Sequence, residues 1–346
     1  MMFGLGVRIV AQRAIGAALA TIVFAGSHLV PAHAEVSELK IAKQYGITYL
    51  PLMLMEADKL VEKHAAAAGL PDLKVGWATF GGGSAMNDAI LSNSLHFASG
   101  GVAPLATIWA RTKGNIEVKC VTAMNAMPIY LNTRNANVKT LKDLSDKDRI
   151  ALPAIKVSLQ AITLQMAAEK EFGPGRHSEL DRLTVAMAHP DGQAALLAGS
   201  TEITGHFSAP PFQYQQLKQP GIRRLLSSYE VLGGPATFTV VWATAKFREE
   251  NPRAYAAFVA AFAEATQAIN ADKRGMAARY LTIANDRKSP VEDIAAMLLD
   301  PEIDFTMTPK NTMKYVEFMH ATGSIKQLPA SWKDLCFDNL HGLPGS

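Results

Sequence analysis

Apolar residues recur along the chain in two alternating patterns, one typical of buried strands and the other typical of helices. Short apolar runs are each followed by a longer segment, in which residues such as Leu52, Met55 and Leu60 fall on one helical face. We expect strands at residues 39–45, 73–80 and 95–100, followed by helices at 50–69, 84–93 and 103–113. A β-α unit repeated in this order predicts a parallel sheet covered by helices.

The same alternation begins again in the middle of the chain. After a strand predicted at 116–124, the middle part predicts strands at 129–134, 149–154, 183–189 and 201–209, with helices at 158–173, 191–199 and 210–218. From residue 237 a further strand-like run leads into a helical tail, whose first long helix starts at Asn251 with Pro252 at its first position. We expect the later helices at 273–284, 289–300 and 308–323.

These changes of pattern predict an α/β fold of two lobes. We expect residues 35–125 together with 235–346 to form lobe 1, and residues 126–234 to form lobe 2, each as an α/β sandwich. The long strand-like runs at both boundaries predict that the chain crosses twice between the lobes. Two crossing strands can act as a hinge.

The first 34 residues have the pattern of a secretory signal peptide. Arg8 and Arg13 precede a 13-residue apolar core, Ala14–Gly26, and a small-x-small site ends at Ala34. The core is shorter than the roughly 18 residues that a membrane span needs. We therefore expect cleavage after Ala34. Because no Cys follows directly, we expect no lipid attachment and a mature protein that diffuses in the periplasm.

Charge and cysteine content exclude several classes of protein. Removing the leader deletes two arginines and no acid, so the formal charge falls from +3 to +1, and no basic cluster suggests a nucleic-acid partner. Cys120 and Cys336 are too few for a disulfide scaffold or a thiolate metal site. We expect Cys120 to be a buried small apolar residue. An exported protein permits a disulfide between the two, but no spacing indicates one.

The stretch FGGGSAMNDAI, residues 80–90, matches none of the common glycine motifs. A P-loop requires a lysine at the start of the helix, and Ala85 follows Ser84 instead. A dinucleotide fingerprint and a serine-hydrolase elbow both require glycine where Met86 stands. The histidines show no H-x-x-x-H or H-E-x-x-H spacing, so we expect no metal. No catalytic group is evident, and we expect no cofactor.

Two interpretations of this glycine stretch remain open. In the first, the glycines let the backbone approach a ligand and Ser84 caps a helix whose free N–H groups favour an anion by roughly 0.3–2 kcal/mol. In the second, Ser84 caps the helix and binds nothing. Asp88, one turn into the helix, weakens the first interpretation because it repels an anion.

The position of the stretch supports the first interpretation. In a doubly wound sheet the turn after a strand opens at the edge where ligands bind, and similar turns follow the other predicted strands. Instead of contacting a ligand, Tyr45 and Tyr49 could pack against the next helix. His189 and His206 could likewise have roles in a turn or in the core. The candidates at these turns are Gln44, Tyr45, Gly46, Tyr49, Gly83, Ser84, Gly101, Ser158, His189, His206, Ser208 and Phe212.

Several segments together resemble a known family. KQYGITYLPL (43–52), FGGGSAMNDAILSNSLHFASGG (80–101), the crossing strands and the helical tail are similar to the periplasmic substrate-binding proteins of nitrate, sulfonate and taurine-type ABC importers. The resemblance implies the type II periplasmic-binding-protein fold, whose two lobes close on one ligand. The resemblance adds two residues to the candidate contacts: Asn125 at the crossing, and Pro210 at the end of the loop that begins at His206.

The resemblance also implies a function without catalysis. We expect a monomer that captures a small organic anion, of sulfonate or carboxylate type and possibly aromatic, and delivers it to a membrane permease. A periplasmic sensor for a kinase or chemoreceptor is the alternative. A related branch contains the fungal synthase of the thiamine pyrimidine, but the cysteine-rich iron-binding stretch of that enzyme is absent from this sequence.

Overall fold

The first of two β-sheets is built mainly from the beginning of the chain. The computed structural model describes residues 34–346, so the predicted leader falls outside the described part except for Ala34. The hydrogen-bonded orders are β1-β2 and β3-β10-β4, and a parallel bridge between Ile41 and Phe97 joins β1 to β3. The resulting order is therefore β2-β1-β3-β10-β4. Its strands are β1 (Glu38–Lys43), β2 (Lys74–Thr79), β3 (Ala98–Gly101), β4 (Val118–Ala126) and β10 (Thr237–Thr244).

The second sheet repeats this order with the middle of the chain. Its strands run β7-β6-β8-β5-β9, with β6 parallel to β7 and β8, and β5 antiparallel to β8 and β9. In each sheet one strand arrives from the other half and pairs antiparallel beside the third strand: β10 in the first and β5 in the second. The strands are β5 (Tyr130–Thr133), β6 (Ile150–Leu152), β7 (Thr184–Ala186), β8 (Gly205–Ser208) and β9 (Arg223–Ser227).

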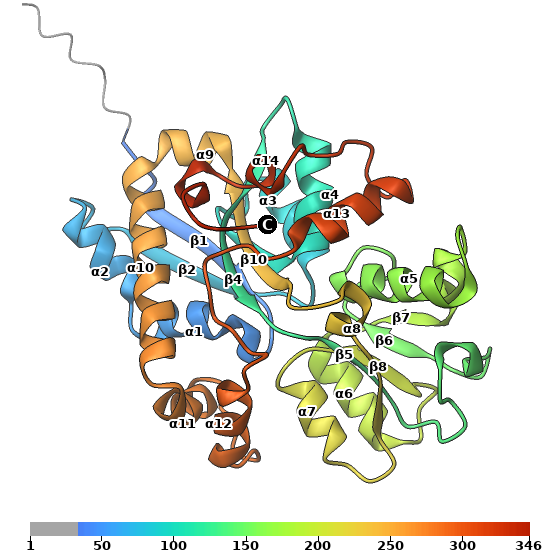
Figure 1. Cartoon of the computed structure of the whole chain (residues 1–346). Coiled ribbons are helices and arrows are strands. Elements are labelled where there is room, and N and C mark those ends of the chain that lie inside the picture. Colours follow the sequence, from blue (N-terminus) through green and yellow to red (C-terminus); the bar gives the residue numbers. More distant parts are fainter. Residues whose placement is uncertain (1–33) are drawn as a thin grey trace, which may run out of the picture. The chain divides into compact units, whose positions relative to one another are not determined.

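Each sheet with its helices forms one lobe, as Figure 1 shows, and the predicted two-lobed α/β fold is confirmed. Lobe 1 contains the sheet with β1 and lobe 2 the sheet with β5. The chain passes between them after β4, which ends at Ala126, and again before β10, which begins at Thr237. Residues Glu35–Ser346 form one compact unit. The predicted lobe boundaries at 125/126 and 234/235 stay a prediction.

The helices cover both faces of the two sheets (Figure 1). Lobe 2 carries α5 (Leu159–Phe172), α6 (His189–Ala198), α7 (Phe212–Leu217) and α8 (Ser228–Leu232). Lobe 1 carries α1 (Leu50–Ala57), α2 (Leu60–Ala67), α3 (Gly83–Leu91), α4 (Val102–Thr112), α9 (Ala245–Glu250), α10 (Pro252–Ala271), α11 (Lys273–Ile283), α12 (Val291–Leu299), α13 (Thr312–Ala321) and α14 (Trp332–Leu335). Among residues 34–346, no helix combines the length and the apolar character that crossing a membrane requires.

The single helix predicted at 50–69 is wrong, because the chain breaks between α1 and α2. Lys59 takes a left-handed conformation, with φ of 51°, and becomes the residue before α2. Such a conformation ends one helix and starts the next in a new direction. Strand β9 and helices α8, α9 and α14 were not expected from the sequence.

The core of lobe 1 forms where α10 lies on the sheet. Phe97, directly before β3, stacks on Phe258 of α10 with ring centroids 3.8 Å apart and an interplanar angle of 9°. Both side chains are fully buried, and Phe262 follows one turn later on the same buried face of α10. This contact ties the C-terminal helices to the strands that lead into the cleft.

Replacing Phe258 by Ala is expected to lower the free energy of unfolding by about 3–5 kcal/mol, because it removes a stacked ring and leaves a cavity. Leu328, which is 44% exposed, is the matched control, and its replacement by Ala is expected to change little. Urea unfolding of both variants measures the difference. Equal losses in the two variants would contradict this description of the core.

Candidate functional site

A small cavity lies between the two lobes, at the carboxyl ends of their parallel strands. Its volume is about 20 Å³, room for about one water molecule, whereas sites for drug-sized ligands span roughly 300–1,000 Å³. In this conformation the lobes are therefore nearly in contact, and a larger ligand requires them to separate. The lining residues are Gln44, Thr48, Tyr49, Gly83, Gly101, Pro104, Pro153, Ser158, Leu159, Gln160, His189, Ala209 and Phe238.

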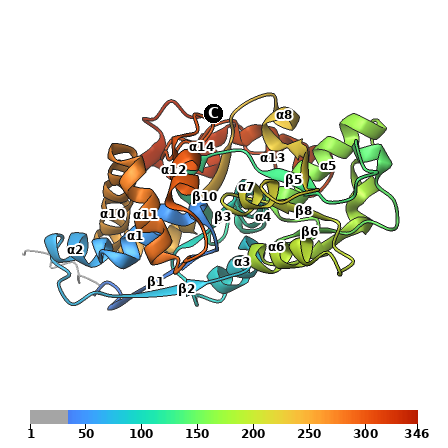
Figure 2. The same cartoon turned by 90° about the horizontal axis from the view of Figure 1, so that it is seen from below.

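Helices α3, α4, α5 and α6 all begin at this cavity. Gly83 and His189 are the first residues of α3 and α6, while Gly101 and Ser158 directly precede α4 and α5. Figure 2 shows α3 and α4 in lobe 1 and α6 in lobe 2 along the boundary between the lobes. The first backbone N–H groups of a helix have no partner within it, and they carry the positive end of its dipole.

The side chains of the cavity carry no formal charge. Among residues 34–346, no Lys, Arg, Asp or Glu lines it, and its one ionisable group of neutral range is His189. Burial lowers the pKa of His189 to about 4, so this imidazole is neutral at physiological pH. The positive potential of the site therefore comes from backbone dipoles of both lobes, an arrangement that favours an anion.

Glycines let the two lobes approach each other at this cavity. A Cβ at Gly101 would lie 2.7 Å from the Cβ of Leu159 in lobe 2. A Cβ at Gly46 would lie 2.8 Å from the carbonyl oxygen of Pro210, and the φ of Gly46, 104°, also favours glycine. Any larger residue at either position would hold the lobes apart.

The glycine stretch of residues 80–90 serves the same approach. A Cβ at Gly81 would lie 3.5 Å from the Cβ of Ala188, and one at Gly82 would lie 3.4 Å from the carbonyl oxygen of Pro153. The predicted capping role of Ser84 is wrong: the residue before α3 is Gly82, so Ser84 lies inside the first turn. The helix starts at Gly83, where an added Cβ would lie 3.1 Å from the Cβ of Pro104, a tight contact.

Ser158 does cap its helix, as its position before an apolar run predicts. Its Oγ accepts a hydrogen bond from the backbone N–H of Ala161 at 3.2 Å. Leu159 and Gln160 form the same first turn of α5, and both residues line the cavity. Ser158 thus holds the start of α5 in place beside the gap.

Polar atoms without partners gather where the crossing strands meet the cavity. Asn125 of β4 donates through Nδ2 to the carbonyl oxygen of Thr48 at 2.8 Å and pairs in register with Thr239 of β10. Within the described residues, Asn125 Oδ1, Thr48 Oγ1 and Thr239 Oγ1 are buried with no hydrogen-bond partner. Buried polar atoms are costly unless a ligand or water satisfies them, so these three atoms favour a polar occupant.

A chain of neutral polar groups leads from the interior of lobe 2 to the cavity. Asn132 Nδ2 donates to the backbone oxygen of Gln213 and to Gln216 Oε1, each at 3.0 Å. Gln216 Nε2 lies 2.7 Å from His206 Nδ1, and His206 Nε2 lies 3.1 Å from His189 Nδ1. His189 Nε2 ends the chain at the cavity wall, 3.3 Å from Gln160 Nε2.

The direction of this chain sets the tautomers of both histidines. Gln216 donates to His206 Nδ1, so the proton of His206 is on Nε2, from which it donates to His189 Nδ1. His189 therefore carries its proton on Nε2. It does not accept from Gln160 Nε2, which is itself a donor, so both groups can donate to an occupant of the cavity. Burial, and next the neighbouring His189, keeps the pKa of His206 well below its usual range.

The predicted site residues divide into two groups. Gln44, Tyr49, Gly83, Gly101, Ser158 and His189 line the cavity. The second group lies behind the cavity wall or beside it and consists of Gly46, Asn125, His206, Ser208, Pro210 and Phe212. Ser208 Oγ donates to Gln216 Oε1 at 3.4 Å, and the Phe212 ring lies 5.7 Å from that of His189. Tyr45 is 43% exposed, and neither it nor Ser84 lines the cavity. Direct contact of any of them with a ligand stays a prediction.

Sequence reasoning missed several residues of the wall. Thr48 and Gln160 stand in turns that were already singled out, so proximity along the chain could have included them. Pro153 and Phe238 come from other segments, and only the folded chain places them at the gap. The missed residues are Thr48, Pro104, Pro153, Leu159, Gln160, Ala209 and Phe238.

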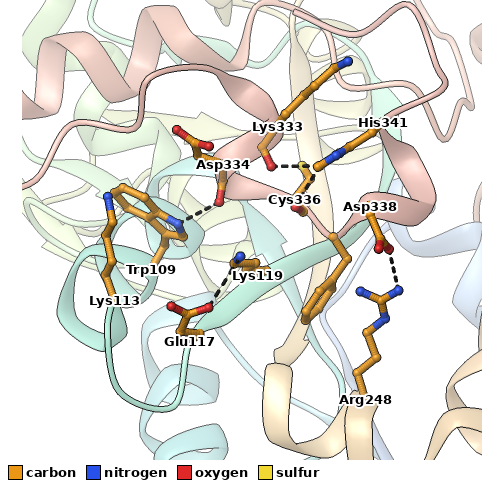
Figure 3. Close-up of a pocket in the computed structure, with 11 residues that line it drawn as sticks. Trp109, Lys113, Glu117, Lys119, Arg248, Lys333, Asp334, Cys336, Asp338 and His341 are labelled. Atoms are coloured by element: carbon orange, nitrogen blue, oxygen red, sulfur yellow. Dashed lines mark hydrogen bonds and ion pairs between the residues drawn. The ribbon is translucent and has the colours of Figure 1, made fainter.

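A larger pocket, of about 330 Å³, lies on lobe 1 alone, around Trp109 and Cys336 (Figure 3). It is remote from the helix N-termini described above and carries charges of both signs. We therefore assign the candidate ligand site to the smaller cavity between the lobes. In residues 34–346, no three His, Cys, Asp or Glu side chains gather in a group that could hold a metal ion.

Comparisons with known proteins agree with this architecture. A model of the NMT1-like family matches residues 32–284. No curated protein sequence is a significant match. The structure is similar to that of the alkanesulfonate-binding protein SsuA from Xanthomonas axonopodis pv. citri bound to MOPS, with 18% identity, a TM-score of 0.65, and coverage of 85% of this chain and 96% of that chain.

Two further solved structures show the same similarity. The periplasmic aliphatic sulphonate binding protein SsuA from Escherichia coli is 19% identical, with a TM-score of 0.61 and coverage of 90% of this chain and 100% of that one. The periplasmic nitrate-binding protein NrtA from Synechocystis PCC 6803 is 16% identical, with a TM-score of 0.64 and coverage of 87% and 84%. At these identities the similarity shows a shared fold. It confirms the resemblance that the sequence segments predict.

Gly101→Ala is expected to shift the protein toward a more open form, because the added methyl group would collide with Leu159. The backbone of Gly101 suits alanine, so the free energy of unfolding should change by less than about 1 kcal/mol. Small-angle scattering should give a larger radius of gyration. Gly81→Ala, which adds a methyl group at ordinary contact distance, is the control, and identical scattering from both variants would contradict the close approach.

Acid is expected to destabilise the protein through His189. Its pKa is about 4 in the folded chain and near 6.5 in an unfolded one, so the unfolded chain binds more protons as the pH falls from about 6.5 to 4. The stability lost over this window should be roughly 2–4 kcal/mol. Urea unfolding at pH 7.5 and at pH 4.5 measures the stability lost between these pH values. His189→Gln should lose less stability than the wild type. His320→Gln, a control at an exposed site, should lose as much as the wild type. Equal losses in all three proteins would contradict the neutral buried histidine.

Proposed function

Because the chain belongs to the NMT1-like family, we propose that it is an exported binding protein that captures a small organic anion between its lobes and delivers it to an ABC importer. The observation that carries this proposal is the convergence of α3, α4, α5 and α6 on one uncharged cavity. The alkanesulfonate-binding, aliphatic sulphonate-binding and nitrate-binding proteins of similar structure support an anion as the bound group.

The helix dipoles and the hydrogen-bond donors of the site together supply enough free energy for capture. Each N-terminus favours an anion by about 0.3–1 kcal/mol, and by up to about 2 kcal/mol when the site is partly buried. Hydrogen bonds from backbone N–H groups and from His189 Nε2 add to this, since bonds to a charged acceptor contribute about 1.5–3 kcal/mol each. Micromolar affinity corresponds to about −8 kcal/mol, which a few such contacts reach.

The apolar part of the wall favours an organic anion over a bare inorganic one. Pro104, Leu159, Ala209 and Phe238 line the cavity together with the ring of Tyr49. These side chains can enclose the carbon body of a sulfonate or carboxylate, while the helix N-termini receive its charged group. For this reason we expect the site to bind an organic sulfonate or carboxylate in preference to nitrate.

Closure of the lobes couples binding to delivery. The ligand enters while the lobes are apart, contacts both, and thereby increases the population of the closed form. Gly46 and Gly101 permit the close approach that this form requires. The permease then distinguishes the closed protein from the open one. This role requires the periplasmic location that the leader predicts.

A thermal-shift screen tests the ligand class. Residues 35–346 would be heated with methanesulfonate, taurine, benzoate and nitrate, and also with neutral glucose and cationic choline. At a concentration of about 100 times Kd a ligand stabilises by about 2.7 kcal/mol, so a bound anion should raise Tm by about 3–6 °C. Stabilisation by an organic anion supports the proposal. Stabilisation only by glucose or choline, or by no compound of the panel, would contradict it.

Gln160→Glu is expected to weaken binding of the stabilising anion by roughly tenfold to a hundredfold, or about 1.4–2.8 kcal/mol. The substitution keeps the size of the side chain and adds a negative charge on the cavity wall. A carboxylate in the first turn of α5 suits the helix dipole, so the fold should persist. Calorimetry at pH 8 measures the affinity, and Gln160→Ala serves as the uncharged control. An unchanged or higher affinity in Gln160→Glu would contradict an anionic ligand.

A further inference from the structure

The two cysteines of the chain lie opposite each other in the fold, although 215 residues separate them in sequence. Cys120, in β4, forms a parallel bridge with Cys336, which directly follows α14. The backbone N–H of Phe337 donates to the carbonyl oxygen of Cys120 at 2.9 Å. Both cysteines are buried and free in the described structure, with exposed fractions of 1% and 4%.

This pairing satisfies the main geometric requirement of a disulfide. Neighbouring strands lie about 4.7–4.9 Å apart, and disulfide-linked residues have Cα atoms about 4.4–6.8 Å apart. Residues opposite each other on neighbouring strands project to the same face of the sheet. The parallel bridge therefore places the side chains of Cys120 and Cys336 next to each other.

Other contacts hold the two segments in this register. Asn339 Nδ2 donates to the carbonyl oxygen of Val121 at 3.0 Å, and Trp109 Nε1 donates to that of Asp334 at 3.0 Å. Asp338 forms an ion pair with Arg248 of α9. Figure 3 shows Trp109, Asp334, Asp338 and Arg248 around Cys336. The native fold therefore brings the thiols together before any covalent bond forms.

We propose that Cys120 and Cys336 form a disulfide that fastens the C-terminal segment to β4, and that it forms by exchange with an external disulfide. This inference rests on the proposed export of the protein, because disulfides persist in an oxidising environment. The oxidant is a low-molecular-weight disulfide, such as oxidised glutathione, or the disulfide of an oxidoreductase. Each protein thiol loses its hydrogen, the S–S bond of the oxidant accepts two electrons and two protons, and two thiols leave.

The surface pocket of lobe 1 determines the order of the two steps. Cys336 lines this pocket of about 330 Å³, together with Lys119, Lys333 and His341, whereas Cys120 lies beneath it. Cys336 therefore attacks the oxidant first and forms a mixed disulfide, releasing the first thiol. Cys120 then attacks the sulfur of Cys336 and releases the second. Burial, and next the hydrogen bond with Cys336, raises the pKa of the Cys120 thiol, which makes Cys120 the slower initial nucleophile.

The bond stabilises the folded chain without reaching the ligand site. It closes a loop of more than 200 residues, and a disulfide across a long loop restricts the unfolded chain most. Oxidation should raise Tm by about 5–10 °C. Because both cysteines lie outside the cavity wall, the affinity for the stabilising anion should stay within about twofold.

The test starts from the reduced, purified chain of residues 35–346, incubated with oxidised glutathione under native conditions. We expect a mass lower by two hydrogen atoms, no thiol titratable after denaturation, a peptide pair linked through Cys120 and Cys336, and the higher Tm. Two thiols that remain titratable, or a product consisting of glutathione adducts or linked dimers, would overturn the proposal.

Single variants test the order of the steps. Cys120→Ala should accumulate one glutathione on Cys336, whereas Cys336→Ala should stay unmodified on the same time scale. The reverse pattern would overturn the assigned order. Cys120→Ser and Cys336→Ser repeat the comparison if an alanine variant does not fold, and the reduced wild-type protein is the reference for Tm.

A separate arm distinguishes this inference from the proposed function. Thiols of the full-length chain, expressed with its leader in a Gram-negative cell, would be trapped with a maleimide before lysis. A disulfide in the cell supports both the bond and export. A purified chain that oxidises in vitro while the cellular protein stays reduced contradicts export and leaves the Cys120–Cys336 pairing confirmed. Failure of the purified chain to oxidise contradicts the bond alone.

Discussion

The positive ends of helices α3, α4, α5 and α6 meet at one gap that is lined, within residues 34–346, by no charged side chain. The remaining features of the site depend on this arrangement. Dipoles of the same sign repel each other, so both lobes would gain from an anion between them. A fixed Arg or Lys in either lobe would hold the anion even when the lobes are apart. Backbone groups divided between the lobes bind it well only when the lobes meet, which links affinity to closure.

The remaining polar groups of lobe 2 support the same arrangement without adding charge. Hydrogen bonds that begin at the backbone oxygen of Gln213 set the tautomers of His206 and His189, so that His189 presents an N–H to the cavity. Burial keeps both imidazoles neutral, since it penalises the charged form. The glycines of lobe 1 complete the site because they let this donor and the opposing helix ends come within reach of one small ligand.

Much of the fold could be predicted from the sequence because strand and helix periodicities report burial, and burial follows from the layered α/β arrangement. The alternation failed at Lys59, where a left-handed residue divides one apolar helical face between two helices, and at β9, whose Arg223 and Arg224 obscure the strand pattern. The cavity residues Gln44, Gly83, Ser158 and His189 could be predicted because turns after parallel strands share one edge of a sheet. Pro153 and Phe238 could not be predicted, since no periodicity indicates which residues of one lobe face the other.

The most direct test follows backbone amides by ¹⁵N NMR while the stabilising anion of the screen is added to the chain of residues 35–346. The central claim is that helix N-termini of both lobes receive one anion. It predicts that the amide signals of Gly83 and Ser84 in lobe 1 and of Leu159 and Gln160 in lobe 2 shift together, with the same Kd. Shifts confined to one lobe, or shifts at a distant surface while these four amides stay unchanged, would contradict the claim.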